Sequence, residues 1–216
     1  MSISTLTALS PLDGRYSTKV GELRQFLSEY GLIRNRVRVE IEWLKALANS
    51  PDIRECPSFS ASTIQELDSV VADFSESDAD AIKMIEARTN HDVKAMEYWL
   101  KERMASSHEA VAVREFIHFG CTSEDINNVA HALMLKDAIK AVLLPACDRT
   151  IERFRELAHQ HASIPMMAHT HGQSATPTTL GKEMANIAAR LLRARSKVAS
   201  VSLTAKFNGA VGNYNA

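Results

Sequence analysis

The sequence has few of the residues that interrupt or crosslink a chain. Its 216 residues contain only eight glycines and six prolines, so regular structure can run over long stretches. The three cysteines, Cys56, Cys121 and Cys147, are an odd number at wide spacing with no CxxC pair. Such a set gives no basis for a disulfide framework or a zinc site, and reduced thiols in a cytoplasmic protein are the simplest interpretation.

Charge of one sign and long apolar runs are also lacking. The formal net charge is −1 at pH 7, which argues against a nucleic-acid or membrane-surface partner, so local positive charge must hold any anionic ligand. The most apolar region, 129–147, is interrupted by charged side chains and by Pro145, so it does not predict a membrane span. Residues 1–11 lack a basic start followed by an apolar run, so no signal peptide is expected.

Helical periodicity dominates, strand-like alternation is almost absent, and 45% hydrophobic residues allow a substantial core. We therefore predict an all-α fold. Residues 1–110 form a helical N-terminal domain in this interpretation, with Ser62 and Ser77 as candidate caps of its second and third helices. Its helices are expected at about 19–49, 60–74, 77–89 and 92–105.

Residues 111–216 are predicted to hold two much longer helices. The first should start at Thr122 or Ser123 and run to about His161, with a bend at Pro145. It is apolar nearly all round between 129 and 147, so it needs cover from several sides. We therefore expect the chain to be the first part of a longer protein that forms an oligomer around a central helical bundle.

The second long helix is expected to begin at Thr176, a good N-cap, with Pro177 at its first position. Its apolar residues recur in alternating steps of three and four, which is the heptad seam of a helical bundle. The seam positions are Leu180, Met184, Ile187, Leu191, Ala194, Val198, Val201 and Ala205.

The stretch HTHGQSATP at 169–177 gathers groups with chemical potential before this helix. His171 can move a proton near neutral pH, Gly172 lets backbone approach a ligand closely, and Gln173 can both donate and accept hydrogen bonds. A metal site at His169 and His171 is disfavoured, because no third ligand lies at a typical spacing.

The other histidines differ in context. His91 lies in the junction Asn90-His91-Asp92 between two predicted helices, where amide, imidazole and carboxylate come together. The structural alternative is an N-cap made by Asn90 or Asp92, with His91 incidental. The histidines at 159 and 161 suit a helix C-terminus, and those at 108, 118 and 131 have no distinctive context.

Two further clusters could bind anions. Thr122 and Ser123 stand at a helix start, where free N–H groups and hydroxyls can hold a carboxylate, although a plain cap explains them equally. The segment 10–16 is a turn that presents Arg15 and Tyr16, and an arginine fork suits a phosphate.

Four motifs occur together and in order along nearly the whole chain. They are SPLDGRY at 10–16, TNHDVKA at 89–95, EFIHFGCTSEDINN at 115–128 and THGQSATPTTLGKEMAN at 170–186. In this combination the sequence resembles adenylosuccinate lyase of the type common in bacteria, a family of the fumarase and aspartase superfamily. The resemblance implies an all-helical fold, a tetramer with active sites shared between subunits, and no cofactor or metal.

The activity that the resemblance implies is a β-elimination by a C–N lyase of purine biosynthesis. Fumarate is released from adenylosuccinate to give AMP, and from SAICAR to give AICAR. Such a reaction needs a base, donors for the developing carboxylate charge, and an acid for the departing nitrogen.

By motif matching, His171 is similar to the family's general acid, and Thr170 and Gln173 are similar to residues that position the substrate. The family often has proline where this chain has Ser174 and arginine where it has His169, and neither change touches the implied acid. The implied general base is a serine in a loop of the form SSxMPxKxNP, which does not occur in residues 1–216. This fragment alone is therefore expected to be inactive.

His91 is implied to orient the substrate and balance charge, with Asn90 and Asp92 as its neighbours. The residues matched to the carboxylate-binding element are Thr122 and Ser123, and those matched to a phosphate-binding pair are Arg15 and Tyr16. Two alternatives stay open, namely another fumarate-releasing lyase such as argininosuccinate lyase or aspartase, and a non-catalytic helical oligomerisation module.

Overall fold

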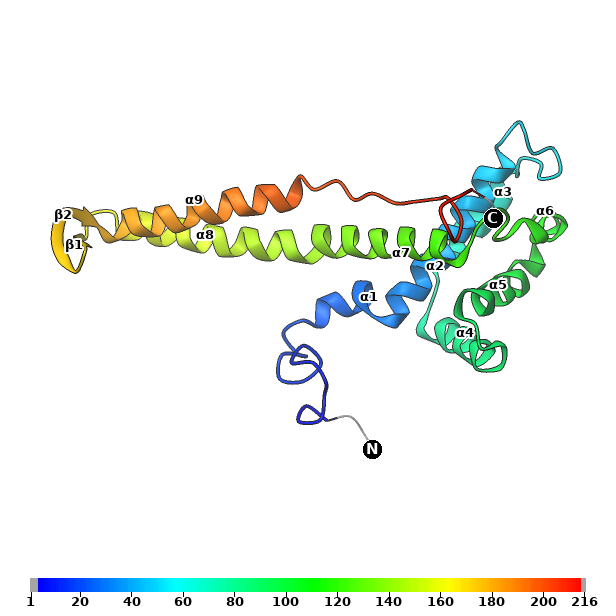
Figure 1. Cartoon of the computed structure of the whole chain (residues 1–216), viewed down its shortest axis with the longest axis horizontal. Helices are drawn as coiled ribbons and strands as arrows, with labels where there is room; N and C mark the ends of the chain where they lie inside the picture. The colour runs from blue at the N-terminus through cyan, green and yellow to red at the C-terminus, as the bar shows by residue number, and fades with distance from the viewer. Residues whose placement is uncertain (1–3, 215–216) are drawn as a thin grey trace. The chain divides into compact units, whose positions relative to one another are not determined.

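The computed structural model describes residues 4–214 (Figure 1). Contacts divide the chain into two compact units, residues 1–136 with 204–216, and residues 137–203. The predicted domains, 1–110 and 111–216, have a different boundary from these two units. The predicted domain division remains a prediction. Helices dominate the described residues, as the all-α prediction requires, and one small hairpin is the exception.

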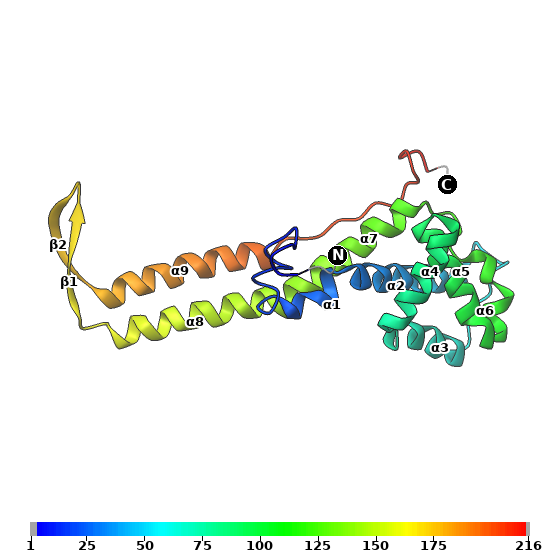
Figure 2. The same cartoon turned by 90° about the horizontal axis from the view of Figure 1, so that it is seen from below.

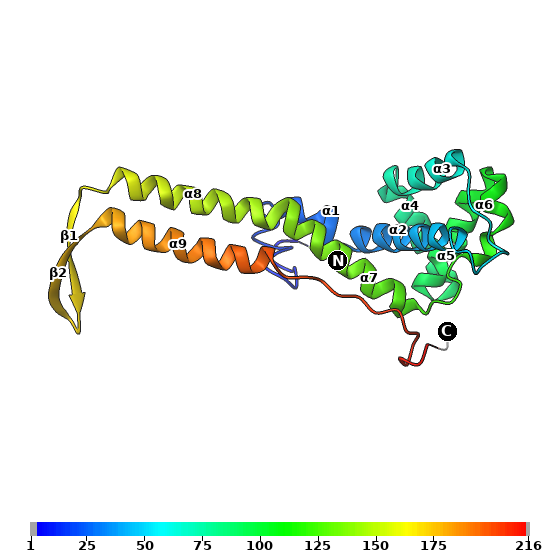
Figure 3. The same ribbon diagram turned by 90° about the horizontal axis from the view of Figure 1, so that it is seen from above.

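The first unit contains most of the helices. They are the 3-10 helix η1 (Gly21–Leu23), α1 (Arg24–Leu27), α2 (Glu29–Ala48), α3 (Ala61–Ala72), α4 (Glu76–Thr89), α5 (Asp92–Arg103), the 3-10 helix η2 (Met104–Ser106), α6 (His108–Ala112), the 3-10 helix η3 (Arg114–Phe116) and all but the end of α7 (Ser123–Ala138). Figure 3 shows α3 to α6 beside α2 in this unit.

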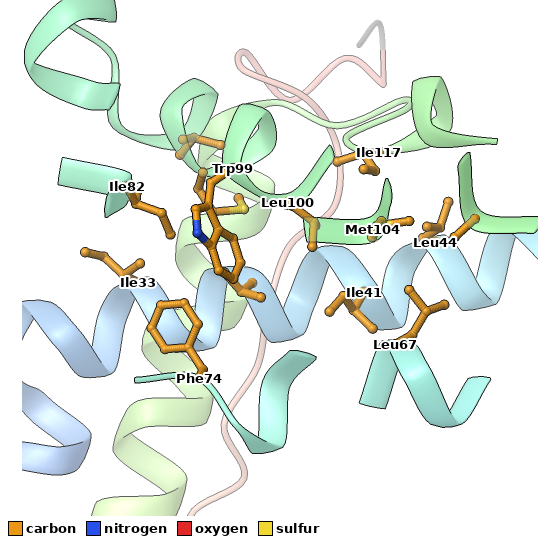
Figure 4. Close-up of a cluster of buried hydrophobic side chains, with 14 of the residues drawn as sticks. Ile33, Ile41, Leu44, Leu67, Phe74, Ile82, Trp99, Leu100, Met104 and Ile117 are labelled. Carbon is orange, nitrogen blue, oxygen red and sulfur yellow. The ribbon is translucent and has the colours of Figure 1, made fainter. Parts of the chain in front are cut away.

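The core of this unit packs on α2. Ile41 and Leu44 of that helix are buried beside Leu67 of α3 and Leu100 of α5, and Ile33 is buried beside Phe74 (Figure 4). These α2 positions follow the helical period, which brings apolar side chains to one face. At about 25 cal/mol per Å² of apolar surface, burial of each such side chain contributes roughly 1.5–3 kcal/mol.

The boundaries of α3, α4 and α5 and the end of α2 agree closely with the predicted ones, whereas the start of α2 and the caps do not. The expected helix at 19–49 is interrupted at Ser28, whose Oγ accepts the Gly31 amide and caps α2. The caps of α3 and α4 are Ser60 and Ser75, so the prediction of Ser62 and Ser77 was wrong. Since a cap must reach the amide of the third helical residue, the earlier serine of each pair takes the role.

The second unit contains the end of α7, a π-helical segment η4 (Ile139–Leu143), α8 (Leu144–Gln160), β1 (Pro165–Thr170), β2 (Gln173–Thr179) and α9 (Leu180–Ala199). The expected helix end near His161 is confirmed. The π-helical segment lies just before Pro145, which has no N–H for the regular ladder.

Helices α8 and α9 lie side by side and antiparallel, joined by the hairpin (Figure 2). Gly181 has room for no side chain, because an added Cβ would meet the carbonyl oxygen of Ala158 on α8. Arg195 of α9 donates two hydrogen bonds to the Asp148 carboxylate of α8 at 2.8 and 2.9 Å. A small residue and a bidentate ion pair thus hold the two helices together.

The predicted start of the last helix at Thr176 and Pro177 was wrong. Residues 165–170 and 173–179 form an antiparallel hairpin, and α9 begins at Leu180 with Thr179 as its N-cap. The β-branched Thr176 and Thr178 favour extended backbone, and both strands are edges, so Pro177 is tolerated. The helix ends at Ala199, so the last two positions of the predicted seam lie beyond it.

Candidate functional site

The Asn90-His91-Asp92 junction is a sharp turn between α4 and α5. Asn90 ends α4 in the left-handed region with φ 54°, and Asp92 is the first residue of α5. His91 itself is the cap of α5, because its Nδ1 accepts the Lys94 amide at 3.2 Å. The structural alternative placed this cap on Asn90 or Asp92 with His91 incidental, and that assignment of the cap was wrong. With Nδ1 as acceptor, the neutral ring carries its proton on Nε2.

A buried arginine joins this turn to the start of α7. Arg36 of α2 donates from Nη2 to Asp92 Oδ2 at 2.6 Å and from Nε to Asn127 Oδ1 at 2.8 Å. Burial alone would raise the pKa of Asp92, but the Val93 amide and the Arg36 guanidinium bring that pKa below its usual value. The structure therefore brings together two of the four motifs within one unit.

The turn also faces an open cavity of about 480 Å³. Its lining includes Lys83 and Glu86 of α4 together with Asn90, His91 and Asp92. Lys83 is paired with Glu86 at 2.7 Å. The lining of the cavity therefore combines an imidazole, an amide, a paired cation and two carboxylates, groups that can hold a polar ligand.

Thr122 and Ser123 lie at a helix start as predicted, since α7 begins at Ser123. Asp125, in the first turn of the helix, accepts the Thr122 amide at 3.0 Å. Its fully buried carboxylate also binds the returning segment, through Lys206 Nζ at 2.8 Å and the Asn208 amide at 3.1 Å. Burial would raise the pKa of Asp125, but these donors bring it below its usual value.

The predicted phosphate pair lies in a turn near the N-terminus. Two amides, those of Asp13 and Gly14, donate to the Ser10 carbonyl, and the Arg15 guanidinium lies 4.8 Å from the centre of the Tyr16 ring. Both side chains are exposed. A cavity of about 810 Å³ beside the turn is lined by residues of the same segment and by the cation of Arg24 and the carboxylate of Glu76. The predicted exposed turn is present.

His171 lies at the tip of the β1–β2 hairpin. His171 and Gly172 have φ of 52° and 75°, which is the signature of a two-residue type I′ turn. Thr170 and Gln173 are the paired residues that flank it, and all four are exposed. Gly172 therefore allows the positive φ that the turn requires. The hairpin belongs to the second unit, and the other candidate residues belong to the first.

The buried Glu40 and the partly buried His118 form a pair that the sequence did not predict. The fully buried carboxylate of Glu40 accepts from His118 Nδ1 at 2.6 Å and from the His118 amide at 2.9 Å. His118 has φ 64° and stands in the motif that contains Thr122. The sequence did contain a signal for buried ion pairs, because Arg36 and Glu40 occupy positions of the apolar stripe on α2.

The ionisation of His118 should make stability depend on pH. Burial would lower the pKa of His118, but Glu40, and Glu97 on α5 at 3.9 Å, raise it above its usual value, with Lys94 opposing. The stability from the charged pair is complete below about pH 6.5 and is lost as pH rises through the raised pKa. Urea unfolding from pH 6 to 9 should show a falling free energy of unfolding.

His118→Gln provides the control for this pH dependence. Glutamine keeps a polar side chain but cannot titrate. The free energy of unfolding should therefore fall less between pH 6 and 9 in this variant than in the wild type. The burial and neighbouring carboxylates that raise the pKa of Cys121 to about 12 keep that thiol neutral over the same range. An equal fall in both proteins would contradict the assignment of the slope to His118.

Within residues 4–214, the range that the structure describes, no three or more His, Cys, Asp or Glu residues gather in an arrangement that could hold a metal ion. No helix there combines the length and apolar character needed to cross a membrane.

The chain is similar to named lyases along its whole length. A family model described as Lyase matches residues 14–216. Over all 216 residues the chain is 56% identical to an adenylosuccinate lyase of Escherichia coli K12, 55% to one of Vibrio cholerae serotype O1 and 54% to one of Haemophilus influenzae. It spans 47% of the length of each of these relatives.

Solved structures share the fold. A fumarate lyase from Mesorhizobium sp. BNC1 matches with a TM-score of 0.68 at 19% identity, covering 90% of this chain and 43% of that one. A β-carboxy-cis,cis-muconate cycloisomerase from Acinetobacter calcoaceticus sp. ADP1 matches with a TM-score of 0.68 at 23% identity, covering 90% and 44%. With the family match over nearly every residue, these findings show that the chain belongs to the lyase family.

Proposed function

We propose that residues 1–216 are the N-terminal part of an adenylosuccinate lyase, a C–N lyase that releases fumarate from adenylosuccinate and from SAICAR. The observation that carries the proposal is the 54–56% identity, over every residue, with three proteins named adenylosuccinate lyase. We place the enzyme in purine biosynthesis, as a cytoplasmic homotetramer without a cofactor. The three free cysteines support the location.

In the proposed mechanism, a base removes the proton beside a carboxylate, and His171 gives a proton to the departing nitrogen. Thr170 and Gln173, beside it at the hairpin tip, position the substrate. Such a role suits an imidazole that stands exposed on a short, conformationally defined turn, since another part of the enzyme can close over it. The general base is proposed to be a serine outside residues 1–216.

The remaining candidate residues are proposed to bind the substrate. Thr122 and Ser123 hold the succinyl carboxylates at the start of α7, where a helix N-terminus favours negative charge. Arg15 and Tyr16 hold the phosphate. His91 presents Nε2–H to the substrate from the 480 Å³ cavity, with Asn90 and Asp92 as its neighbours.

The test is a comparison of fumarate release by two proteins. The full-length protein should cleave adenylosuccinate, and the purified chain 1–216 should not, because the proposed serine loop is absent from it. Absorbance reports the cleavage. A full-length protein that is inert with adenylosuccinate and SAICAR, but turns over argininosuccinate or aspartate, would replace the proposal with another lyase of the superfamily.

A non-catalytic helical module is the second candidate, and one observation favours it. His91 caps α5 and Asn90 ends α4 in the left-handed region, so two candidate residues already have structural roles. A module of this kind would assemble normally and cleave none of the four substrates. The same assay therefore separates the two functions.

A further inference from the structure

Arg36 is a buried cation whose two partners lie on two different motifs. Its side chain is only 7% exposed and stands on α2 between the core residues Ile33 and Val37. A buried charge is costly unless it is paired and hydrogen-bonded. Arg36 meets that requirement with Asp92, 56 residues away, and Asn127, 91 residues away.

The first of these contacts bears on His91. While Arg36 Nη2 holds Asp92 Oδ2, the Val93 amide holds Asp92 Oδ1 at 2.8 Å, so both carboxylate oxygens have partners. Asp92 begins α5, and the residue before it caps the helix by accepting the Lys94 amide. The guanidinium therefore restrains the backbone that sets the direction of the His91 ring.

The second contact bears on the start of α7. Asn127 lies four residues after Ser123, so the two share a face of the helix. Arg36 Nε holds Asn127 Oδ1 at 2.8 Å. The same planar group thus restrains the helix turn that presents the proposed carboxylate-binding hydroxyls.

We propose that Arg36 is a positioning residue of the lyase site, which fixes the Asn90-His91-Asp92 turn and the first turn of α7 relative to each other. The proposal rests on the proposed function for its kinetic part. The guanidinium offers two donors at a fixed separation and angle, whereas a lysine ammonium is a single point charge. Lysine at position 36 can therefore reach one partner and must release the other.

The kinetic test uses Arg36→Lys and Arg36→Met in the full-length protein, with Arg34→Met as the matched control on the same helix. Each Arg36 variant is expected to lose about 10–100-fold in kcat, since displacement of a catalytic group by about 1 Å costs up to 10²-fold. KM should change less, and Arg34→Met should match the wild type. Wild-type kcat in Arg36→Lys would overturn the proposal.

A chemical test does not depend on activity. Diethyl pyrocarbonate attacks an unprotonated imidazole nitrogen, and in His91 that nitrogen is engaged by the Lys94 amide although 52% of the side chain is exposed. Residue-resolved mass spectrometry should show His91 reacting slowly in the wild type and several-fold faster in both Arg36 variants. The exposed His108 serves as internal reference and should not change.

The kinetic test and the labelling test can fail independently of each other. If the full-length protein cleaves no adenylosuccinate, the proposed function is wrong, and the labelling of His91 still decides whether Arg36 positions the turn. An unchanged His91 rate in a folded Arg36→Lys protein would overturn the inference even if the enzyme is active. Arg36→Lys keeps the buried charge, so it remains measurable if Arg36→Met fails to fold.

Discussion

Replacement of His171 by asparagine in the full-length protein is expected to lower turnover of adenylosuccinate by about 10²–10⁴-fold, the usual contribution of a general acid. Asparagine is the sharper choice because His171 has φ 52° at the first position of a type I′ turn followed by Gly172. Asn-Gly is the preferred pair for such a turn, so the hairpin should persist while the proton donor is removed. Initial rates from the absorbance change measure the effect.

Two further variants serve as comparisons for His171→Asn. His171→Ala removes the same group but places an alanine in the left-handed region, so its activity should fall as far and its stability should fall in addition. His169→Asn changes an exposed strand residue two positions away and should keep near wild-type kcat. Full activity of His171→Asn would leave the histidine as a turn residue and move the acid role to His91.

Asp125→Ala is expected to lower the free energy of unfolding by about 3 kcal/mol or more. The carboxylate is fully buried and accepts four hydrogen bonds, two on each oxygen, from the amides of Thr122, Asn208 and Gly209 and from Lys206 Nζ. Removal of one member of a buried charged network typically costs about 3–5 kcal/mol, because the remaining polar groups lose their partners.

Urea unfolding of the wild-type and Asp125→Ala proteins measures this loss of unfolding free energy. Glu124→Ala is the matched control, because it removes an exposed carboxylate from the same first turn of α7. Only the favourable interaction with the helix N-terminus is lost there, about 0.3–1 kcal/mol. Equal losses in the two variants would show that the network around Asp125 contributes no more than ordinary helix-end electrostatics.

Local patterns predicted most helices because the forces that form a helix are local. Periodic apolar positions and few breakers placed α3 to α5, the end of α2 and the long helical run from 123 to 160 within a few residues, but they did not predict the break before α2 at Ser28. The caps were misplaced by two residues at α3 and α4, since several serines stood near each helix start and only geometry chooses among them.

The hairpin shows where local patterns were insufficient. Thr176 and Pro177 satisfied the rule for a helix start, yet residues 173–179 pair with 165–170. Three of the signals for strands were present: β-branched threonines, a His-Gly turn and a proline that an edge strand tolerates. Two short strands at the end of a helix pair are stabilised by their pairing with each other. The residues of one short segment, taken alone, do not predict that pairing.

The sequence by itself determined the mainly helical class, the family resemblance and the candidate groups at helix junctions, because periodicity and motif composition are properties of short segments. Only the tertiary structure decided which of those groups meet. Arg36 contacts Asp92 and Asn127, and Glu40 contacts His118, across 56, 91 and 78 residues of chain. Buried charges must find partners wherever packing places them, so these contacts depend on how α2, α5 and α7 assemble.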